Sequence, residues 1–329
     1  MQDKLTPRQA RAWSLCALSV PAAMALPGCG WLWVLGGSIL ACALAACQQA
    51  MQRHSGLCMR QAFARAFGAV GGRIMAAAEL LWLLFAASGA AAASQIAFED
   101  DLGPFLPAIP LLLAALAGQK GRLAAGRVCA VLALCLAGLY AVIAAASLRH
   151  VQVDWSRPQG VPADAALAFC LCLGPVCMAF VTAEEETPRI SPGTAAASAL
   201  LPAAPAFLTA ACLSPELARQ EPLPFLTLTK SLSVLSVMQR FELLLSVAQL
   251  LGLFALLTML VCAAERMLGA VRRKNGMGST GGVFCLLAFG GSILAYRLPI
   301  WSWAVGAAIF WGVVPILTQV IVNIKKSEK

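Results

Sequence analysis

Residues 165–183 read AALAFCLCLGPVCMAFVTA, an apolar run that Gly174-Pro175 interrupts near its middle. Residues 12–28 read AWSLCALSVPAAMALPG, a second apolar run with Pro21 near its middle. Apolar runs with so few charges are typical of membrane-spanning helices, and a proline inside a helix removes one backbone hydrogen bond. These two stretches predict an all-α membrane protein in which two spans are broken.

The composition of the whole chain supports the same class. Of its 329 residues, 60% are hydrophobic and only 12% are charged, whereas a soluble domain carries nearer a quarter charged residues. Most of the 13 cysteines lie inside apolar runs, which favours a role as small hydrophobic residues over a disulfide framework. Cys170 and Cys172 would point about 200° apart on a helix, so we expect neither a metal site nor a cofactor.

Charged residues and Gly/Pro turns divide the apolar sequence into about ten predicted spans. Their boundaries are 12–28, 31–47, 74–97, 102–117, 128–148, 165–183, 194–213, 243–264, 282–298 and 300–324. The first run follows basic residues, as a signal peptide does, but we interpret it as a retained span.

The distribution of Lys and Arg predicts the orientation of these spans. With both termini in the cytoplasm, eighteen of the 24 Lys and Arg residues fall on the cytoplasmic side. Cytoplasmic connections of membrane proteins carry such an excess, so the net charge of +9 needs no nucleic-acid partner. We expect a single integral membrane domain, residues 1–329.

Ten spans also divide into two halves of five, residues 10–148 and 163–324. An odd number of spans per half places the second half upside down, which is the inverted-repeat plan of many secondary transporters. The interrupted helices would be spans 1 and 6, where the carbonyls of Ala17 and Leu171 lose their usual partners. This arrangement predicts a midplane ligand site; ordinary proline kinks are an equally compatible interpretation. The residues of the predicted breaks are Ser19, Pro21, Ala22, Gly174 and Pro175.

A few polar residues in other spans are candidates for the same site. Ser88 in span 3 and Gln249 in span 8 could line a cavity, although hydrogen bonding between helices is the commoner use of such residues. Glu79 is the one acid well inside a predicted span, and acids in membranes are candidate functional residues. Its alternative is an interfacial position near Arg73. The sequence shows no catalytic set, and we expect no enzyme activity.

Three short segments resemble spore-germination permeases, the B subunits of GerA-type germinant receptors in the amino acid–polyamine–organocation superfamily. The first is Leu5-Thr6-Pro7-Arg8-Gln9, before span 1. The second is Gly118-Gln119-Lys120-Gly121-Arg122, followed by Arg127-Val128, between spans 4 and 5. The third precedes span 8 and comprises Pro224-Phe225-Leu226-Thr227-Leu228 and Met238-Gln239-Arg240-Phe241-Glu242.

This resemblance implies a five-plus-five fold of the leucine-transporter type and a subunit that senses a small germinant, commonly an amino acid. It also implies A-type and C-type receptor subunits as partners, in the inner membrane of a spore. Arg240 and Glu242 would form an outer pair that positions span 8 for assembly or signalling, or a plain surface ion pair. The alternative functions are an amino-acid or polyamine permease and a structural subunit whose ligand site has decayed.

Overall fold

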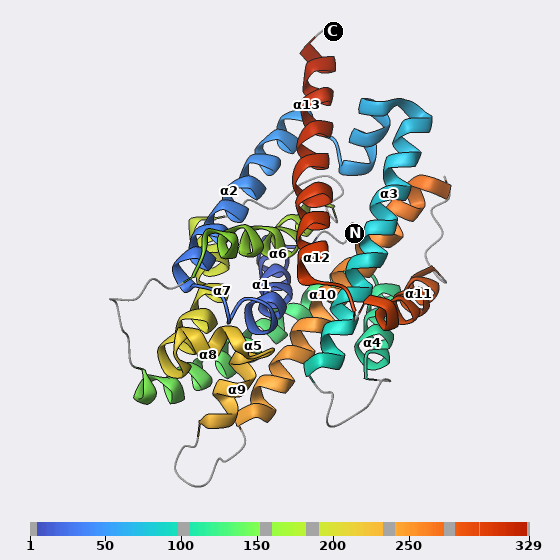
Figure 1. The fold of residues 1–329 in the computed structure, drawn as a ribbon. Helices are drawn as coiled ribbons and strands as arrows, with labels where there is room; N and C mark the ends of the chain where they lie inside the picture. Colours follow the sequence, from blue (N-terminus) through green and yellow to red (C-terminus); the bar gives the residue numbers. More distant parts are fainter. Residues whose placement is uncertain are drawn as a thin grey trace.

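The computed structural model describes residues 5–97, 106–151, 160–181, 191–232, 241–272, 280–295 and 297–327, and every regular element in these ranges is helical (Figure 1). The elements of the first half are α1 (Pro7–Met24), α2 (Trp31–Ser55), α3 (Met59–Ala97), α4 (Ala108–Gln119), α5 (Arg122–Ser147) and the 3-10 turn η2 (Leu148–His150). Those of the second half are α6 (Pro162–Val181), α7 (Pro192–Leu213), α8 (Pro215–Gln220), α9 (Pro224–Ser231), α10 (Phe241–Arg272), α11 (Thr280–Ala295), α12 (Ile300–Ala307), the π-helix η3 (Ala308–Val313) and α13 (Val314–Ser327).

Six of the described helical stretches are long and apolar enough to cross a membrane, which supports the predicted membrane class. They are Trp31–Ser55, Met59–Gln95, Arg122–His150, Pro192–Leu213, Glu242–Gly269 and Ile300–Ser327. Three shorter apolar helices are Ala108–Gln119, Pro162–Cys177 and Gly281–Ala295. The count of ten spans stays a prediction.

The structure differs from the sequence prediction at the two prolines. Helix α1 continues through Pro21 and α6 continues through Pro175, so neither helix is unwound there. A proline removes only its own N–H, and a helix packed on its neighbours tolerates the loss of one bond. Near Pro21 the helix also ends within a turn, because the amides of Ala25 and Leu26 both donate to the Pro21 carbonyl.

The first segment that carries the family resemblance lies at the start of α1 and packs beside the second. Thr6 and Gln9 form a capping box, in which the Thr6 hydroxyl accepts from the Gln9 amide and the Gln9 side chain accepts from the Thr6 amide. Leu5 packs against Gly126 of α5, where a Cβ atom would collide with the leucine side chain. Gly121 begins α5 with a φ of 85°, a conformation that favours glycine.

The long helices pack in two groups of four, which lie to the left and right in Figure 1. Helices α1, α2, α6 and α7 form the first group, in which α2 lies most closely against α6 and α7. The second group contains α3, α4, α10 and α11. The two groups are joined mainly where α1 lies along α10, and no comparably close backbone packing links α6 to α3.

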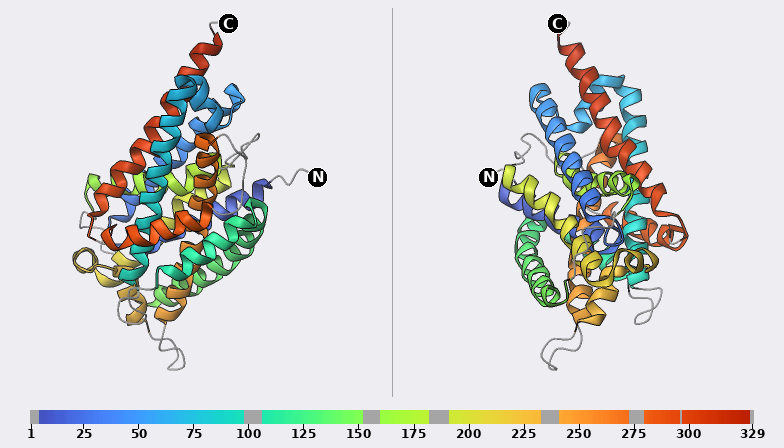
Figure 2. Two further views of the ribbon diagram at one scale, coloured as in Figure 1. Left: turned by 90° about the vertical axis from the view of Figure 1, so that its right-hand side faces the viewer. Right: turned by 60° about the vertical axis from the view of Figure 1, so that its left-hand side comes forward.

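Different elements lie at the two ends of the molecule. The C-terminal end of α13 projects at one end, beside the connection between α2 and α3 (Figure 2). There Lys325 donates to the Ala66 carbonyl at 2.8 Å, next to a kink in α3 at Gly68, and Lys326 donates to the His54 carbonyl at 2.9 Å. The short helices α8 and α9 lie at the opposite end (Figure 1). The sequence prediction included neither of these helices nor the first part of α3.

Candidate functional site

An aromatic cluster lies between α3 and the last membrane-spanning segment. Trp82 of α3 stacks on Phe310 with a centroid separation of 5.6 Å and meets Trp311 edge to face at 5.3 Å. One turn along α3, Phe85 stacks on Trp303 of α12 at 3.8 Å. Aromatic pairs in these arrangements stabilise one another beyond their buried area, so the cluster fixes α3 against α12 and η3.

Each tryptophan of the aromatic cluster packs on a glycine of a neighbouring helix. Trp311 covers Gly174 of α6, where a Cβ atom would lie 2.5 Å from Cε3 and 2.8 Å from Cη2 of the ring. Trp82 covers Gly306 and Trp303 covers Gly89 in the same way. Gly174 was a predicted ligand residue; in this conformation its surface is occupied by Trp311.

Several buried polar atoms at the aromatic cluster have no hydrogen-bond partner among the described residues. They are Oε2 of Glu79 and the indole Nε1 atoms of Trp82 and Trp311. Glu79 lies one turn before Trp82 on α3 and is 3% exposed, whereas Arg73 is exposed. Glu79 is therefore buried among the helices and does not pair with Arg73, while its depth in the membrane stays a prediction. Unpartnered buried polar atoms are costly, which is why they mark candidate sites.

The π-helix η3 carries a second polar feature. Its carbonyls at Trp311 and Gly312 accept from the amide of Gln48 on α2, at 2.8 and 3.3 Å. A cavity of about 20 Å³ adjoins these bonds, which is room for roughly one water molecule. It is lined by Gln48, Gln52, Met59, Cys177, Trp311, Pro315 and Gln319. Two of the lining residues, Trp311 and Gln319, hold unpartnered buried atoms, so the cavity is suited to a polar occupant.

The interface between α1 and α10 contains two of the predicted ligand residues. Ser19 packs against Gly252 of α10 and donates its hydroxyl to the Cys16 carbonyl at 2.7 Å. The hydroxyl of Tyr140 donates to the Ser19 carbonyl at 3.3 Å. Gln249 lies one turn before Gly252, is 1% exposed, and has no partner for either amide atom. Ser19 and Gln249 thus flank one interface.

The remaining predicted residues lie elsewhere. Ser88 packs against Gly291 of α11 and donates to the Leu84 carbonyl at 2.9 Å, on the far side of α3 from Glu79. Pro21 and Ala22 are buried in α1, and Pro175 follows Gly174 in α6. Arg240 lies outside the described residues, and Glu242 is half-buried in the first turn of α10.

Sequence reasoning missed the aromatic cluster. Its signal was the recurrence of aromatic residues and glycine at helical spacing, in Trp82, Phe85 and Gly89 and again in Trp303 and Gly306. Such spacing places the residues near one another on a helix surface, but it does not identify the helix that they face.

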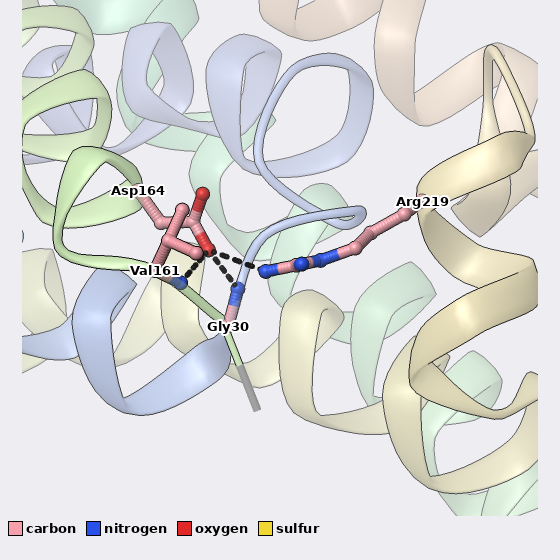
Figure 3. A network of polar contacts seen from close by, with 4 residues as sticks. All are labelled: Gly30, Val161, Asp164 and Arg219. Atoms are coloured by element: carbon pink, nitrogen blue, oxygen red, sulfur yellow. Dashed lines mark hydrogen bonds and ion pairs between the residues drawn. The ribbon is translucent and has the colours of Figure 1, made fainter. Parts of the chain in front are cut away.

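An ion-pair network joins the α1–α2 turn, the start of α6 and α8 (Figure 3). One carboxylate oxygen of Asp164 accepts from the amides of Gly30 and Val161, at 2.8 and 3.1 Å, and from Arg219 at 3.3 Å. Nearby, burial and the Asp164 charge raise the pKa of Cys29 to about 12, while Arg219 lowers it. The network therefore fastens α8 over the amino-terminal end of α6.

A groove of about 560 Å³ lies between α2 and α7. Its lining is almost wholly apolar, with Leu35, Ile39, Ala195, Ala199 and Leu200 among its residues. It lacks the converging polar groups that a site for a polar molecule requires, so the candidate site is the region around Glu79, Trp311 and Gln249.

No protein-family profile and no curated protein matches the chain. Among solved structures, the fold is similar to that of Mhp1, a nucleobase-cation-symport-1 family transporter, in a closed conformation with bromovinylhydantoin bound. The TM-score is 0.68 at 14% sequence identity, and the match covers 96% of this chain and 77% of that chain. At this identity the likeness establishes the fold, which is that of a membrane transporter.

Proposed function

We propose that this chain is a secondary transporter that binds a small polar molecule between α1 and α6 on one side and α3 and α10 on the other. In this proposal the cytoplasmic side of the protein is the end where α13 projects. Five basic residues gather at that end: Arg53, Arg60, Arg65, Lys325 and Lys326. Amino acids are the first ligand class to test, in keeping with the sequence resemblance.

The observation that carries this proposal is the correspondence between packing pairs in the two halves. If α1 to α5 correspond in order to α6, α7, α10, α11 and the α12–α13 segment, four close pairs have counterparts, whereas the close packing of α1 on α10 has none between the described parts of α6 and α3. The pairing of α1 with α5 matches that of α6 with α12, and α2 with α6 matches α7 with α1. Likewise α3 with α11 matches α10 with α4, and α3 with α13 matches α10 with α5. This pattern supports the inverted repeat that alternating access uses.

The side chains at the junction of the two groups support a small polar ligand. Unpartnered groups include a carboxyl, two indole N–H donors and a primary amide, and the two indoles belong to the aromatic cluster. Such a set can hydrogen-bond a compact molecule and stack on it. Because the aromatic cluster is closely packed, binding would require Trp82 or Trp311 to move.

Uptake into proteoliposomes tests the proposal. Vesicles holding the purified full chain are offered pools of labelled amino acids, polyamines and nucleobases, with empty vesicles as the blank. We expect one pool to accumulate, and Gln249→Leu to reduce that uptake at least tenfold. Thr258→Val on the same helix is the matched control, because the Thr258 hydroxyl is already bonded to the Phe254 carbonyl at 2.7 Å. Wild-type vesicles that accumulate no pool would count against transport.

The second candidate is a germinant-sensing subunit of a spore receptor, with A-type and C-type partners. The specific observation in its favour is that Leu5 of the first resembling segment contacts Gly126, which directly precedes Arg127-Val128 of the second. Here the ligand would shift a conformational equilibrium that the partners detect, and the Arg240–Glu242 segment would serve assembly or signalling.

Dipicolinate release distinguishes the candidates. Spores lacking the gene and their complemented parent are exposed to the same nutrient pools. Loss of release to one pool, restored on complementation, favours the receptor. Normal release together with vesicle uptake favours the transporter. Normal release without uptake, after redundant receptors are deleted, favours a structural subunit with a decayed site.

A further inference from the structure

Glu79 is an acid inside a membrane span with nothing to balance a charge. Its side chain is 3% exposed, and no hydrogen bond or ion pair to it occurs within the described residues. Moving an ionised carboxylate from water to such a position costs several kcal/mol unless a cation or hydrogen-bond donors compensate. Glu79 therefore has to hold a cation or be neutral.

Neither a divalent ion nor an organic ammonium group has an evident place at Glu79. The described residues contain no group of three or more His, Cys, Asp or Glu side chains that could hold a divalent ion. A sodium ion, which backbone carbonyls can also hold, is the alternative that the vesicle experiment below distinguishes. An organic ammonium group needs a cavity, and Glu79 lines neither the groove between α2 and α7 nor the cavity at η3. A proton needs neither ligands nor volume.

Ionisable groups on the helices around α3 do not compensate Glu79 either. Glu265 of α10 lies against Gly118 and Gly281, and Lys325 of α13 is bonded to the carbonyls of Arg65 and Ala66. The other described ionisable side chains on α3 and on the elements packed against it are Arg60, Arg65, Arg73, Glu242, Cys262, Arg266, Cys285 and Lys326. No hydrogen bond or ion pair joins any of them to the Glu79 carboxyl within the described residues.

We propose that Glu79 is a proton-binding site, and that the coupling ion of the proposed transporter is a proton. In the conformation described here the carboxyl is neutral and closed off behind Trp82. When Trp82 and Trp311 separate, water reaches Glu79, and the carboxyl releases its proton to that water and becomes a carboxylate. Return to the closed packing requires a proton again, because the unprotonated form cannot be buried unpaired. This inference rests on the proposed transport function.

Infrared spectroscopy of the purified full chain tests the proton directly and needs no substrate. We expect the carbonyl stretch of a buried protonated carboxylic acid at neutral pH, and its loss in Glu79→Gln. Glu242→Gln, at the end of α10, is the control and should keep the band. A spectrum that is identical in wild type and Glu79→Gln would overturn the assignment. Because glutamine imitates the neutral acid, Glu79→Gln should also unfold at the wild-type temperature at neutral pH.

Coupling is tested in vesicles that contain a pH-sensitive dye, with the labelled pool that wild type accumulates. We expect uptake to acidify the lumen and to rise with an inward proton gradient. The ratio of uptake with the gradient to uptake without it should be at least tenfold smaller in Glu79→Gln than in wild type. Uptake driven by sodium and indifferent to pH would overturn proton coupling and leave transport standing. The infrared band without any uptake would instead refute the transport proposal and leave the proton site standing.

Discussion

Substitution of Gly174 by alanine tests whether Trp311 packs on α6 as described. The new Cβ atom would lie 2.5 Å from Cε3 and 2.8 Å from Cη2 of the indole, well inside the contact distance of about 3.5–4.0 Å. The ring also meets Trp82 edge to face, at 5.3 Å between centroids, so it cannot move without disturbing the aromatic cluster. Overpacking of this kind costs about 1–3 kcal/mol.

The control removes the effect of helix propensity. Alanine is favoured over glycine inside a helix by about 1 kcal/mol, which offsets part of the clash. Gly290→Ala in α11 gains the same stabilisation from helix propensity, and no atom lies within 4 Å of its added Cβ. The difference in unfolding free energy between the two variants is therefore the clash itself, about 1–3 kcal/mol in favour of Gly290→Ala.

The assay is thermal unfolding of the purified chain in detergent micelles, followed by tryptophan fluorescence. Gly174→Ala should melt several degrees below Gly290→Ala. Adding Trp311→Leu to Gly174→Ala should cost less than the two single changes together, because the smaller side chain relieves the clash. Equal melting temperatures for Gly174→Ala and Gly290→Ala would refute the packing of Trp311 on Gly174.

Three further outcomes follow from the described contacts. Gln48→Leu should lower the unfolding free energy by about 1–3 kcal/mol in denaturant titrations, because it leaves two carbonyls of η3 without their donor, whereas an unchanged midpoint would contradict that role. With its pKa near 12, Cys29 should react with maleimide at neutral pH roughly a hundredfold more slowly than a free cysteine, and labelling should rise with pH; Cys29→Ser identifies its share of the signal. Removing the Arg219 charge in Arg219→Ala would by itself slow the labelling of Cys29 further. Faster labelling in that variant would therefore show that the Arg219–Asp164 ion pair keeps α8 packed over Cys29, and slower labelling would show the charge effect only. Lys325→Ala should speed amide hydrogen exchange severalfold in residues 59–67, because the carbonyls of Arg65 and Ala66 lose their donor. Ser327→Ala should leave exchange unchanged, and equal exchange in both variants would argue against a stabilising role of the Lys325 bonds.

The membrane class and most helix positions could be predicted from sequence, because long apolar runs leave few other structures. The extent of α3 could not. Predicted span 3 began at residue 74, whereas the helix begins at Met59 and kinks at Gly68. The depth of Glu79 depends on that extent and on the helices around it, so sequence alone left both an interfacial and a buried position open.

The predicted site residues lie at several separate positions in the structure. The prolines marked α1 and α6, but tertiary packing keeps both helices continuous through Pro21 and Pro175. Ser19 and Gln249 lie at one interface, while Ser88 packs on Gly291 of α11. The seating of Trp311 on Gly174 joins residues far apart in sequence, and no local pattern specifies such a pair.

The close packing of α1 along α10 has no counterpart between α6 and α3, and this inequality bears on the populations of two states. If the halves exchange conformations, as alternating access requires, α6 must approach α3 and α1 must withdraw from α10. Trp311 packs on Gly174 of α6 and meets Trp82 of α3, so the two rings lie between α6 and α3. If the proposed exchange occurs, these rings would oppose the approach of α6. Every 1.4 kcal/mol, approximately, by which a variant weakens that opposition would then shift the ratio of the two conformers about tenfold.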